Sequence, residues 1–365
     1  MSDLAISTMV GGAAFAAGLV FGVTAQRTNF CTMGALSDIV FMGDWRRFRA
    51  WMLALATAMI ASQVLDGAGL VDLGKSIYLQ GPLVWAGAII GGVLFGFGMT
   101  LAGGCGNKTL VRIGGGNMKS LVSFLVIGLF AYMTLKGLIG LGRVQLEAAT
   151  NITVAGHAAN QGLPALLAAL GVPANVARWL VTAILGGGLL VFCFKNAEFR
   201  TSPADMIGGV IIGLMVPTGW WITGVLGADD FDPTALSSFT FVAPIGDSMM
   251  YLMTFTGSTI NFGIAAVGGV ITGSFVAALS GKGFHWEAFS DAADMRRHLM
   301  GAAMMGTGGV MAMGCTIGQG LTGISTLSAT SVIAVLSIIF GGVWGLKSME
   351  EGSPAAGLRA VLSRG

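Results

Sequence analysis

GGVLFGFGMTLAGGCGNKTLVRIGGG, residues 91–116, is an apolar, glycine-rich run that reaches a cysteine and then turns polar. Its first six residues recur in altered form as AGLVFG (17–22), GGVIIG (208–213) and GAAMMG (301–306). Small residues four apart let helix backbones approach closely, so tight helix packing is predicted for Gly18 with Gly22, Gly92 with Gly96, and Gly209 with Gly213. Nine residues after the last glycine of each unit come, in chain order, Cys31, Cys105, Ile222 and Cys315. Internal repetition commonly reflects a repeated architecture, so we expect the residue at this shared position to be functional.

The composition is that of an integral membrane protein. The 365 residues are 54% apolar and 10% charged, with a mean hydropathy of +0.81, whereas soluble domains are roughly 25% charged. The uncharged runs are long enough for helices that cross a bilayer core, which needs roughly 20 residues, and too unbroken for barrel strands. They cover residues 4–26, 82–107, 206–228, 248–281 and 299–346. A net charge of +2 is too small to favour nucleic-acid binding.

We therefore predict an all-α integral membrane protein with about nine transmembrane helices. They are expected near residues 4–25, 47–66, 82–104, 118–140, 176–195, 203–219, 259–280, 298–315 and 326–346. Lys and Arg gather after every second span, beginning with the first, and the opposite loops carry acidic residues such as Asp66, Asp72 and the run 229–232. The positive-inside rule then places the N-terminus outside and the C-terminus in the cytoplasm of a bacterial inner membrane.

This topology makes the repeats inverted, because the first two units end at the inner face and the last two at the outer face. The expected organisation is 4+1+4: a first half at 1–142, a connecting loop and fifth span at 143–200, an inverted half at 201–347 and a cytoplasmic tail at 348–365. Inverted halves with interrupted helices at the bilayer midplane are typical of transporters. The loop 141–175 is predicted to be a surface segment with a short helix.

Each repeat cysteine opens a segment that we predict to be short and re-entrant. These segments read CTMGALSDIV (31–40), CGNKTLVRIGGG (105–116) and CTIGQGLTGIS (315–325), with PTGWWITGVLG (217–227) in the corresponding third place. Irregular backbone at membrane depth is tolerated where protein buries it or where it lines a cavity. Four such segments meeting from two sides predict a narrow waist, where exposed amides favour an anion.

The cysteines have several interpretations. An isolated membrane cysteine such as Cys193 is expected to be an ordinary small apolar residue, but three cysteines at one repeat position point to function. A structural disulfide is not expected across opposite faces, and zinc is not expected, because there is no CxxC and no histidine at ligand spacing. GGCGNKT departs from a phosphate loop at Asn107. The remaining interpretation is that the thiols are weak donors that hold a substrate briefly and then release it.

The same three segments resemble a known family. RTNFCTMGALSD (27–38), LAGGCGNKTLVRIGGGN (101–117) and MGCTIGQGLTGIS (313–325) are similar to the cysteine motifs of the YeeE/YedE family of sulfur-transport membrane proteins, whose characterised members take up thiosulfate. The resemblance implies an hourglass-shaped helical protein in which the cysteines at the waist pass the ion inward through S–H hydrogen bonds. It also implies a soluble TusA-like sulfur carrier as a cytoplasmic partner.

We thus predict an inner-membrane thiosulfate importer, with no catalytic residue, metal or cofactor. Its substrate-binding residues are Cys31, Cys105 and Cys315. Additional path-lining candidates are Asn107, Lys108, Trp221, Thr223, Thr316 and Gln319. Trp221 and Ile222 are expected to narrow the path, and Lys108 and Arg112 either attract the departing anion or only mark the cytoplasmic face. The alternatives are a carrier of another sulfur or selenium species, and a membrane thiol redox sensor or enzyme.

Overall fold

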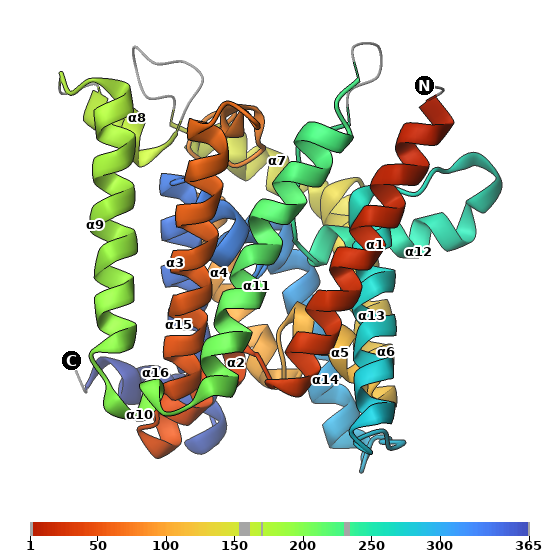
Figure 1. Ribbon diagram of the computed structural model, residues 1–365. Coiled ribbons are helices and arrows are strands. Elements are labelled where there is room, and N and C mark those ends of the chain that lie inside the picture. Colours follow the sequence, from red (N-terminus) through yellow and green to blue (C-terminus); the bar gives the residue numbers. More distant parts are fainter. Residues whose placement is uncertain (1–2, 153–160, 169–170, 230–233, 364–365) are drawn as a thin grey trace.

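The computed structural model describes residues 3–152, 161–168, 171–229 and 234–363 (Figure 1). Within these ranges every regular element is helical, apart from three isolated β-bridges. The predicted all-α class is therefore confirmed. Most of the acidic run 229–232 lies outside the described residues.

Each of the nine predicted spans forms an α-helix. These helices are α1 (Asp3–Arg27), α3 (Arg46–Gly67), α4 (Trp85–Leu101), α6 (Met118–Leu135), α9 (Ala174–Phe194), α11 (Pro203–Trp221), α13 (Phe262–Ser280), α14 (Ala292–Met311) and α15 (Ala329–Glu350). In the described part of the chain, eight helical segments are long and apolar enough to cross a membrane, and α14 is not among them. Its first turns carry Asp294, Arg296 and Arg297, which make it less apolar than the other eight, and the prediction of about nine membrane helices agrees with this number to within one helix.

Short helical segments follow four of the long helices, where the sequence predicts re-entrant backbone. They are α2 (Thr32–Ser37) with the π-helical turn η1 (Asp38–Met42), α5 (Gly106–Gly114), and the π-helical turns η3 (Ile222–Leu226) and η5 (Gly318–Gly323). The third differs from the others, since η3 continues α11 directly at Ile222. The predicted third segment, 217–227, therefore does not begin at a break in the helix. Pro217 lies inside α11, and the helix continues past it.

The remaining elements lie between the long helices and at their ends. They are η2 (Leu73–Lys75), α7 (Leu138–Thr150), α8 (Leu163–Ala168), α10 (Ala197–Arg200), α12 (Val242–Met253), η4 (Phe255–Gly257) and α16 (Pro354–Leu362). The fourth span was predicted to reach residue 140, but α6 ends at Leu135. Lys136 leaves the helical conformation and Gly137 precedes α7. The loop 141–175 thus contains most of α7 as well as the short helix α8.

The glycines of the repeats let helix backbones pack closely. A Cβ atom on Gly22 would lie 2.2 Å from the Val270 carbonyl oxygen of α13, and one on Gly96 would lie 2.1 Å from the Ile338 carbonyl oxygen of α15. Comparable backbone contacts at 2.5–2.9 Å involve Gly18, Gly92, Gly209 and Gly213. The prediction that these small residues, spaced four apart, mediate helix packing is confirmed.

The helix packing supports an inverted repeat, which stays a prediction. In Figure 1, α1 begins at the upper end of the molecule and α11 begins at the lower end, next to α10. The predicted halves match α1 with α11, α3 with α13, α4 with α14, and α6 with α15. If each helix is replaced by its match in the other half, the pair α1–α13 becomes α11–α3, and the pair α4–α15 becomes α14–α6. All four pairs pack extensively in the structure.

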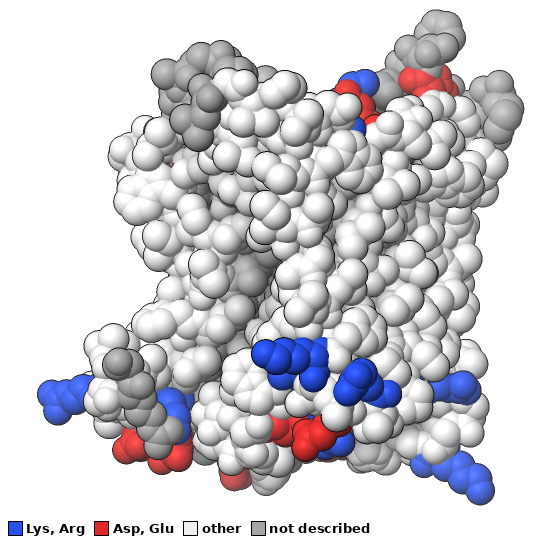
Figure 2. All heavy atoms as spheres, turned by 60° about the vertical axis from the view of Figure 1, so that its left-hand side comes forward, with Lys and Arg blue, Asp and Glu red and all other residues white. Residues whose placement is uncertain are grey.

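Charged side chains separate along the axis of the bundle. Figure 2 shows most of the visible Lys and Arg residues at the lower end, below a broad uncharged band. This end contains the last turn of α1 with Arg27 and the start of α3 with Arg46 and Arg47. Such a band between charged ends is what a bilayer-embedded surface requires.

Candidate functional site

Cys31 and Cys105 lie side by side in the protein interior. Cys31 follows α1 and is the N-cap of α2, where its sulfur accepts a hydrogen bond from the Gly34 backbone N–H at 3.5 Å. Cys105 is the N-cap of α5. Their sulfur atoms are 4.0 Å apart, and their exposures are 6% and 0%. Two segments separated by 74 positions in sequence thus bring two thiols within weak hydrogen-bonding distance.

Cys315 belongs to the same buried cluster of residues as Cys31 and Cys105. Its sulfur accepts a hydrogen bond from the Gly318 backbone N–H at 3.4 Å. The next residue, Thr316, brings its hydroxyl up to the Cys105 sulfur, although no hydrogen bond of good geometry forms. The start of the Cys315 segment thus lies against Cys105, which itself lies beside Cys31.

Tyr78 lies against the Cys315 segment and was not predicted from the sequence. A Cβ on Gly318 would lie 3.5 Å from the Tyr78 hydroxyl and 2.4 Å from Thr240 Oγ1. Burial raises the pKa of Tyr78, so its phenol stays neutral. Tyr78 also contacts Trp220 edge to face, with ring centroids 6.5 Å apart. Its position in an irregular loop between α3 and α4 left no sequence signal.

Asn107 and Gln319 are both buried, as expected of residues near the waist. The Cys105 thiol donates to Asn107 Oδ1 at 2.7 Å. Gln319 Nε2 donates to the Ala312 carbonyl at 2.5 Å, which ties η5 back to the end of α14. Asn107 is therefore in direct contact with a cysteine, and the hydrogen bond of Gln319 holds the segment that follows Cys315.

Trp221 and Thr223, two of the predicted path-lining residues, have different surroundings. Trp221 is 40% exposed, whereas the neighbouring Trp220 is fully buried and donates from Nε1 to Ser325 Oγ at 3.3 Å. Consecutive residues of a helix point about 100° apart, so only one of the two indoles can face the interior. The Thr223 hydroxyl is engaged by the Ser237 backbone, donating to its carbonyl at 2.7 Å.

Basic residues surround the loop that precedes Cys31. Lys108 donates to the Asn29 side-chain oxygen. Arg47 donates to the Asn29 carbonyl and to Asp38 Oδ2, at 2.9 Å each, so both cations hold the loop that precedes Cys31. A small pocket of about 10 Å³ lies here, lined in part by Asn29, Cys31 and Arg47. Arg112, by contrast, donates to the Gly103 carbonyl at 2.8 Å.

Cys193 is separate from this group. It is buried in α9 and packs with Ala50, Leu53 and Phe199 in a cluster of its own. Its thiol donates to the Arg49 carbonyl at 3.3 Å. Cys193 therefore joins α9 to α3, in keeping with its interpretation as an ordinary buried cysteine.

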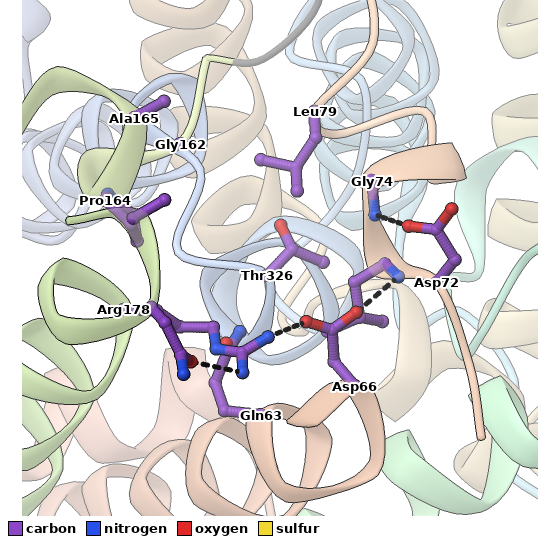
Figure 3. Close-up of a pocket in the computed structure, with 13 residues that line it drawn as sticks. Gln63, Asp66, Asp72, Gly74, Leu79, Gly162, Pro164, Ala165, Arg178 and Thr326 are labelled. Atoms are coloured by element: carbon purple, nitrogen blue, oxygen red, sulfur yellow. Dashed lines mark hydrogen bonds and ion pairs between the residues drawn. The ribbon is translucent and has the colours of Figure 1, made fainter. Parts of the chain in front are cut away.

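A larger cavity of about 340 Å³ lies between the end of α3 and the start of α9, at the end of the bundle opposite the basic end (Figure 3). Arg178 projects across it and pairs with Asp66 at 2.6 Å, so its charge is already neutralised. Leu79 and Thr326 also line the cavity. Leu79 follows Tyr78 in sequence, so the cavity extends to the residue next to the one that contacts the Cys315 segment.

Comparison with known proteins identifies the family. A family model described as sulphur transport matches residues 27–344, which include all three cysteine motifs. The chain belongs to the sulphur transport family. This sulphur transport protein is 27% identical to the thiosulfate transporter TsuA of Escherichia coli K12, over 90% of the chain and 91% of the relative.

Two further relatives agree with this assignment. The thiosulfate transporter TsuA of Spirochaeta thermophila is 27% identical over 89% of the chain and 94% of its own length. The probable transporter YedE of Escherichia coli K12 is 33% identical over 28% of the chain and 23% of its own length. The relatives are named as transporters, so this sulphur transport protein is a multi-pass membrane transporter and not an enzyme.

Proposed function

We propose that this transporter imports thiosulfate, with Cys31, Cys105 and Cys315 as successive weak donors at a central constriction. The observation that supports it most directly is the 4.0 Å approach of the Cys31 and Cys105 sulfurs, with the segment of Cys315 against Cys105. The two thiosulfate transporters that align over nearly the whole chain support the choice of substrate. Another sulfur or selenium anion is the alternative substrate.

Thiols suit this task because they bind weakly. A thiol is a weak donor and a weak acceptor, and conduction requires binding that favours entry but still permits release. The sulfur–sulfur distance of 4.0 Å lets one soft terminal atom pass from one thiol to the next without an intervening stretch of apolar surface. A chain of strong donors would hold the anion too firmly to conduct it.

The direction of transport follows from the orientation that we propose. The basic end of the bundle faces the cytoplasm of the inner membrane, so the outer cavity is the entrance and the pocket at Cys31 is the exit. A TusA-like carrier is the proposed cytoplasmic acceptor. A phosphatase fused after Gly365 should be inactive, because it should remain in the cytoplasm, and an active fusion would reverse the orientation.

Uptake of radiolabelled thiosulfate tests the function. In cells that lack other thiosulfate routes, expression of the chain should produce uptake, and excess unlabelled thiosulfate should compete for it. Replacement of Cys31, Cys105 and Cys315 together by alanine should bring uptake down to the background, because no thiol remains at the constriction. Normal uptake by this triple variant at equal expression would exclude the cysteine relay. Better competition by selenium species than by thiosulfate would favour the alternative substrate.

Lys108 is expected to assist release at the cytoplasmic side. Lys108→Gln should lower uptake about fivefold, the effect of roughly 1 kcal/mol for one partly screened charge interaction. Lys195→Gln is the matched control, because Lys195 is exposed at the same end of the bundle, just after α9. Initial uptake rates at equal expression provide the comparison. Equal rates for both variants would show that Lys108 only marks the cytoplasmic face.

A further inference from the structure

Each cysteine motif also contributes a buried polar group that has no hydrogen-bond partner among the described residues. These groups are Thr32 Oγ1, Asn107 Nδ2 and Thr316 Oγ1. The three side chains are 2%, 1% and 1% exposed. Buried polar groups in folded proteins are normally satisfied, and an unsatisfied one is costly. Three such groups within two positions of the three cysteines indicate a ligand that supplies their partners.

Two of the three groups are placed directly at Cys105. The Cys105 thiol donates to Asn107 Oδ1 at 2.7 Å, which leaves the N–H groups of Nδ2 free to donate elsewhere. The Thr316 hydroxyl approaches the same sulfur from the opposite half of the chain. Cys105 is thus surrounded by a second thiol, an amide and a hydroxyl, so soft and hard groups occur together.

The third repeat unit provides an internal comparison. Ile222 takes the place of the cysteine there, and Thr223 follows it as Thr32 follows Cys31. The Thr223 hydroxyl is fully engaged, since it donates to the Ser237 carbonyl at 2.7 Å and accepts from the Ser237 N–H at 3.2 Å. Among the described residues, the repeat unit that lacks a thiol therefore has no buried side-chain donor without a partner, whereas each of the three units with a cysteine has one.

We infer that Thr32, Asn107 and Thr316 bind the oxygen atoms of a sulfur oxyanion whose terminal sulfur faces the thiols. This inference rests on the proposed function and assigns the residues that recognise the hard end of its substrate. Amide and hydroxyl N–H and O–H groups donate well to oxyanion oxygens, and thiols are the softer partners. A site of this composition favours an anion that has both oxygen atoms and a terminal sulfur over sulfate, which has oxygen atoms only. Sulfate would leave the thiols without the terminal sulfur they are expected to contact, and unpaired groups in a site penalise the wrong ligand.

Binding of radiolabelled thiosulfate to the purified full-length protein tests the inference, with Thr316→Val and Asn107→Leu as the main variants. Thr316→Val removes only the hydroxyl, whereas Asn107→Leu removes the amide donors together with the oxygen that accepts from the Cys105 thiol, and both keep a similar shape. Loss of one hydrogen bond to a charged ligand should weaken thiosulfate binding about tenfold or more. Thr316→Ser keeps a hydroxyl and should bind within about twofold of the unchanged protein. Thr223→Val is the matched control and should also retain affinity, because its hydroxyl is engaged by backbone.

The outcomes separate this inference from the proposed function. If the unchanged protein does not bind thiosulfate and does not import it, the proposed function fails. If the unchanged protein binds thiosulfate and Thr316→Val and Asn107→Leu bind equally well, the function stands and the assigned donors are wrong. A loss in Thr316→Val that Thr316→Ser does not restore would indicate a packing effect, which also contradicts the inference. Thermal unfolding of each variant is measured first, so that binding is compared only between folded proteins.

Discussion

Cys105→Ala is expected to reduce thiosulfate uptake more than any other single cysteine substitution, by at least about tenfold. Cys105 is the thiol with the largest number of observed polar neighbours: the Cys31 sulfur at 4.0 Å, Asn107 Oδ1 at 2.7 Å and the Thr316 hydroxyl. Its removal would interrupt the proposed cysteine path and would remove the thiol that donates to Asn107 Oδ1. Initial rates of labelled uptake at matched expression measure the effect.

Cys193→Ala is the matched control for Cys105→Ala. Cys193 is equally buried, at 0% exposure, but it lies in the separate cluster between α9 and α3. Both substitutions remove the same sulfur atom from a packed interior, so their costs to stability should be similar. Cys193→Ala should therefore transport nearly normally. If the two variants lost uptake to the same extent, the effect of Cys105→Ala would be one of folding, and its role in the path would be rejected.

Gly96→Ala is expected to destabilise the folded protein by about 3 kcal/mol, at the upper end of typical overpacking costs. The new Cβ would lie 2.1 Å from the Ile338 carbonyl oxygen and 2.7 Å from the Gly342 backbone nitrogen. Both contacts are with helix backbone, which cannot move aside as a side chain would. Helices α4 and α15 would have to separate, which would disturb the segment that carries Cys105. The temperature at which half the protein loses its monodisperse elution peak measures the change.

Gly188→Ala is the control for this substitution. Gly188 lies in α9, where an added Cβ would meet no atom within 4 Å. Alanine is a better helix former than glycine by about 1 kcal/mol, so this variant should be at least as stable as the unchanged protein. If Gly96→Ala proved equally stable, the close approach of α4 and α15 would not be required for the fold.

Much of the fold was accessible from sequence because a bilayer restricts the choices. A spanning segment must satisfy its own backbone hydrogen bonds, so long apolar runs can only be helices, and every predicted span is a helix in the structure. The spacing of Gly18 with Gly22 and of Gly92 with Gly96 also identified the tight helix contacts. The exception in apolarity is α14, where Asp294 and two arginines occupy the first turns. These charged residues precede the predicted span 298–315, and the helix begins earlier, at Ala292.

The candidate site was only partly accessible in the same way. The repeat predicts the three cysteines as site residues. Thr32 was not among the predicted residues, although it follows Cys31 in CTMG as Thr316 follows Cys315 in CTIG. Trp221 was chosen where Trp220 is the buried indole. Adjacent apolar residues on a helix carry no sequence label for the side that faces inward, since that depends on how α11 is rotated against its neighbours.

By itself the sequence determined the membrane class, the helical spans, the repeated cysteine position and the basic end of the bundle. These features follow from local composition and spacing, which act along the chain. Only the tertiary structure decided that Cys31 and Cys105 are neighbours, that Thr316 reaches Cys105, that Thr223 is engaged by Ser237 and that Tyr78 covers the Cys315 segment. Each of these joins residues from different helices or loops, whose approach is set by side-chain and backbone packing between segments distant in sequence.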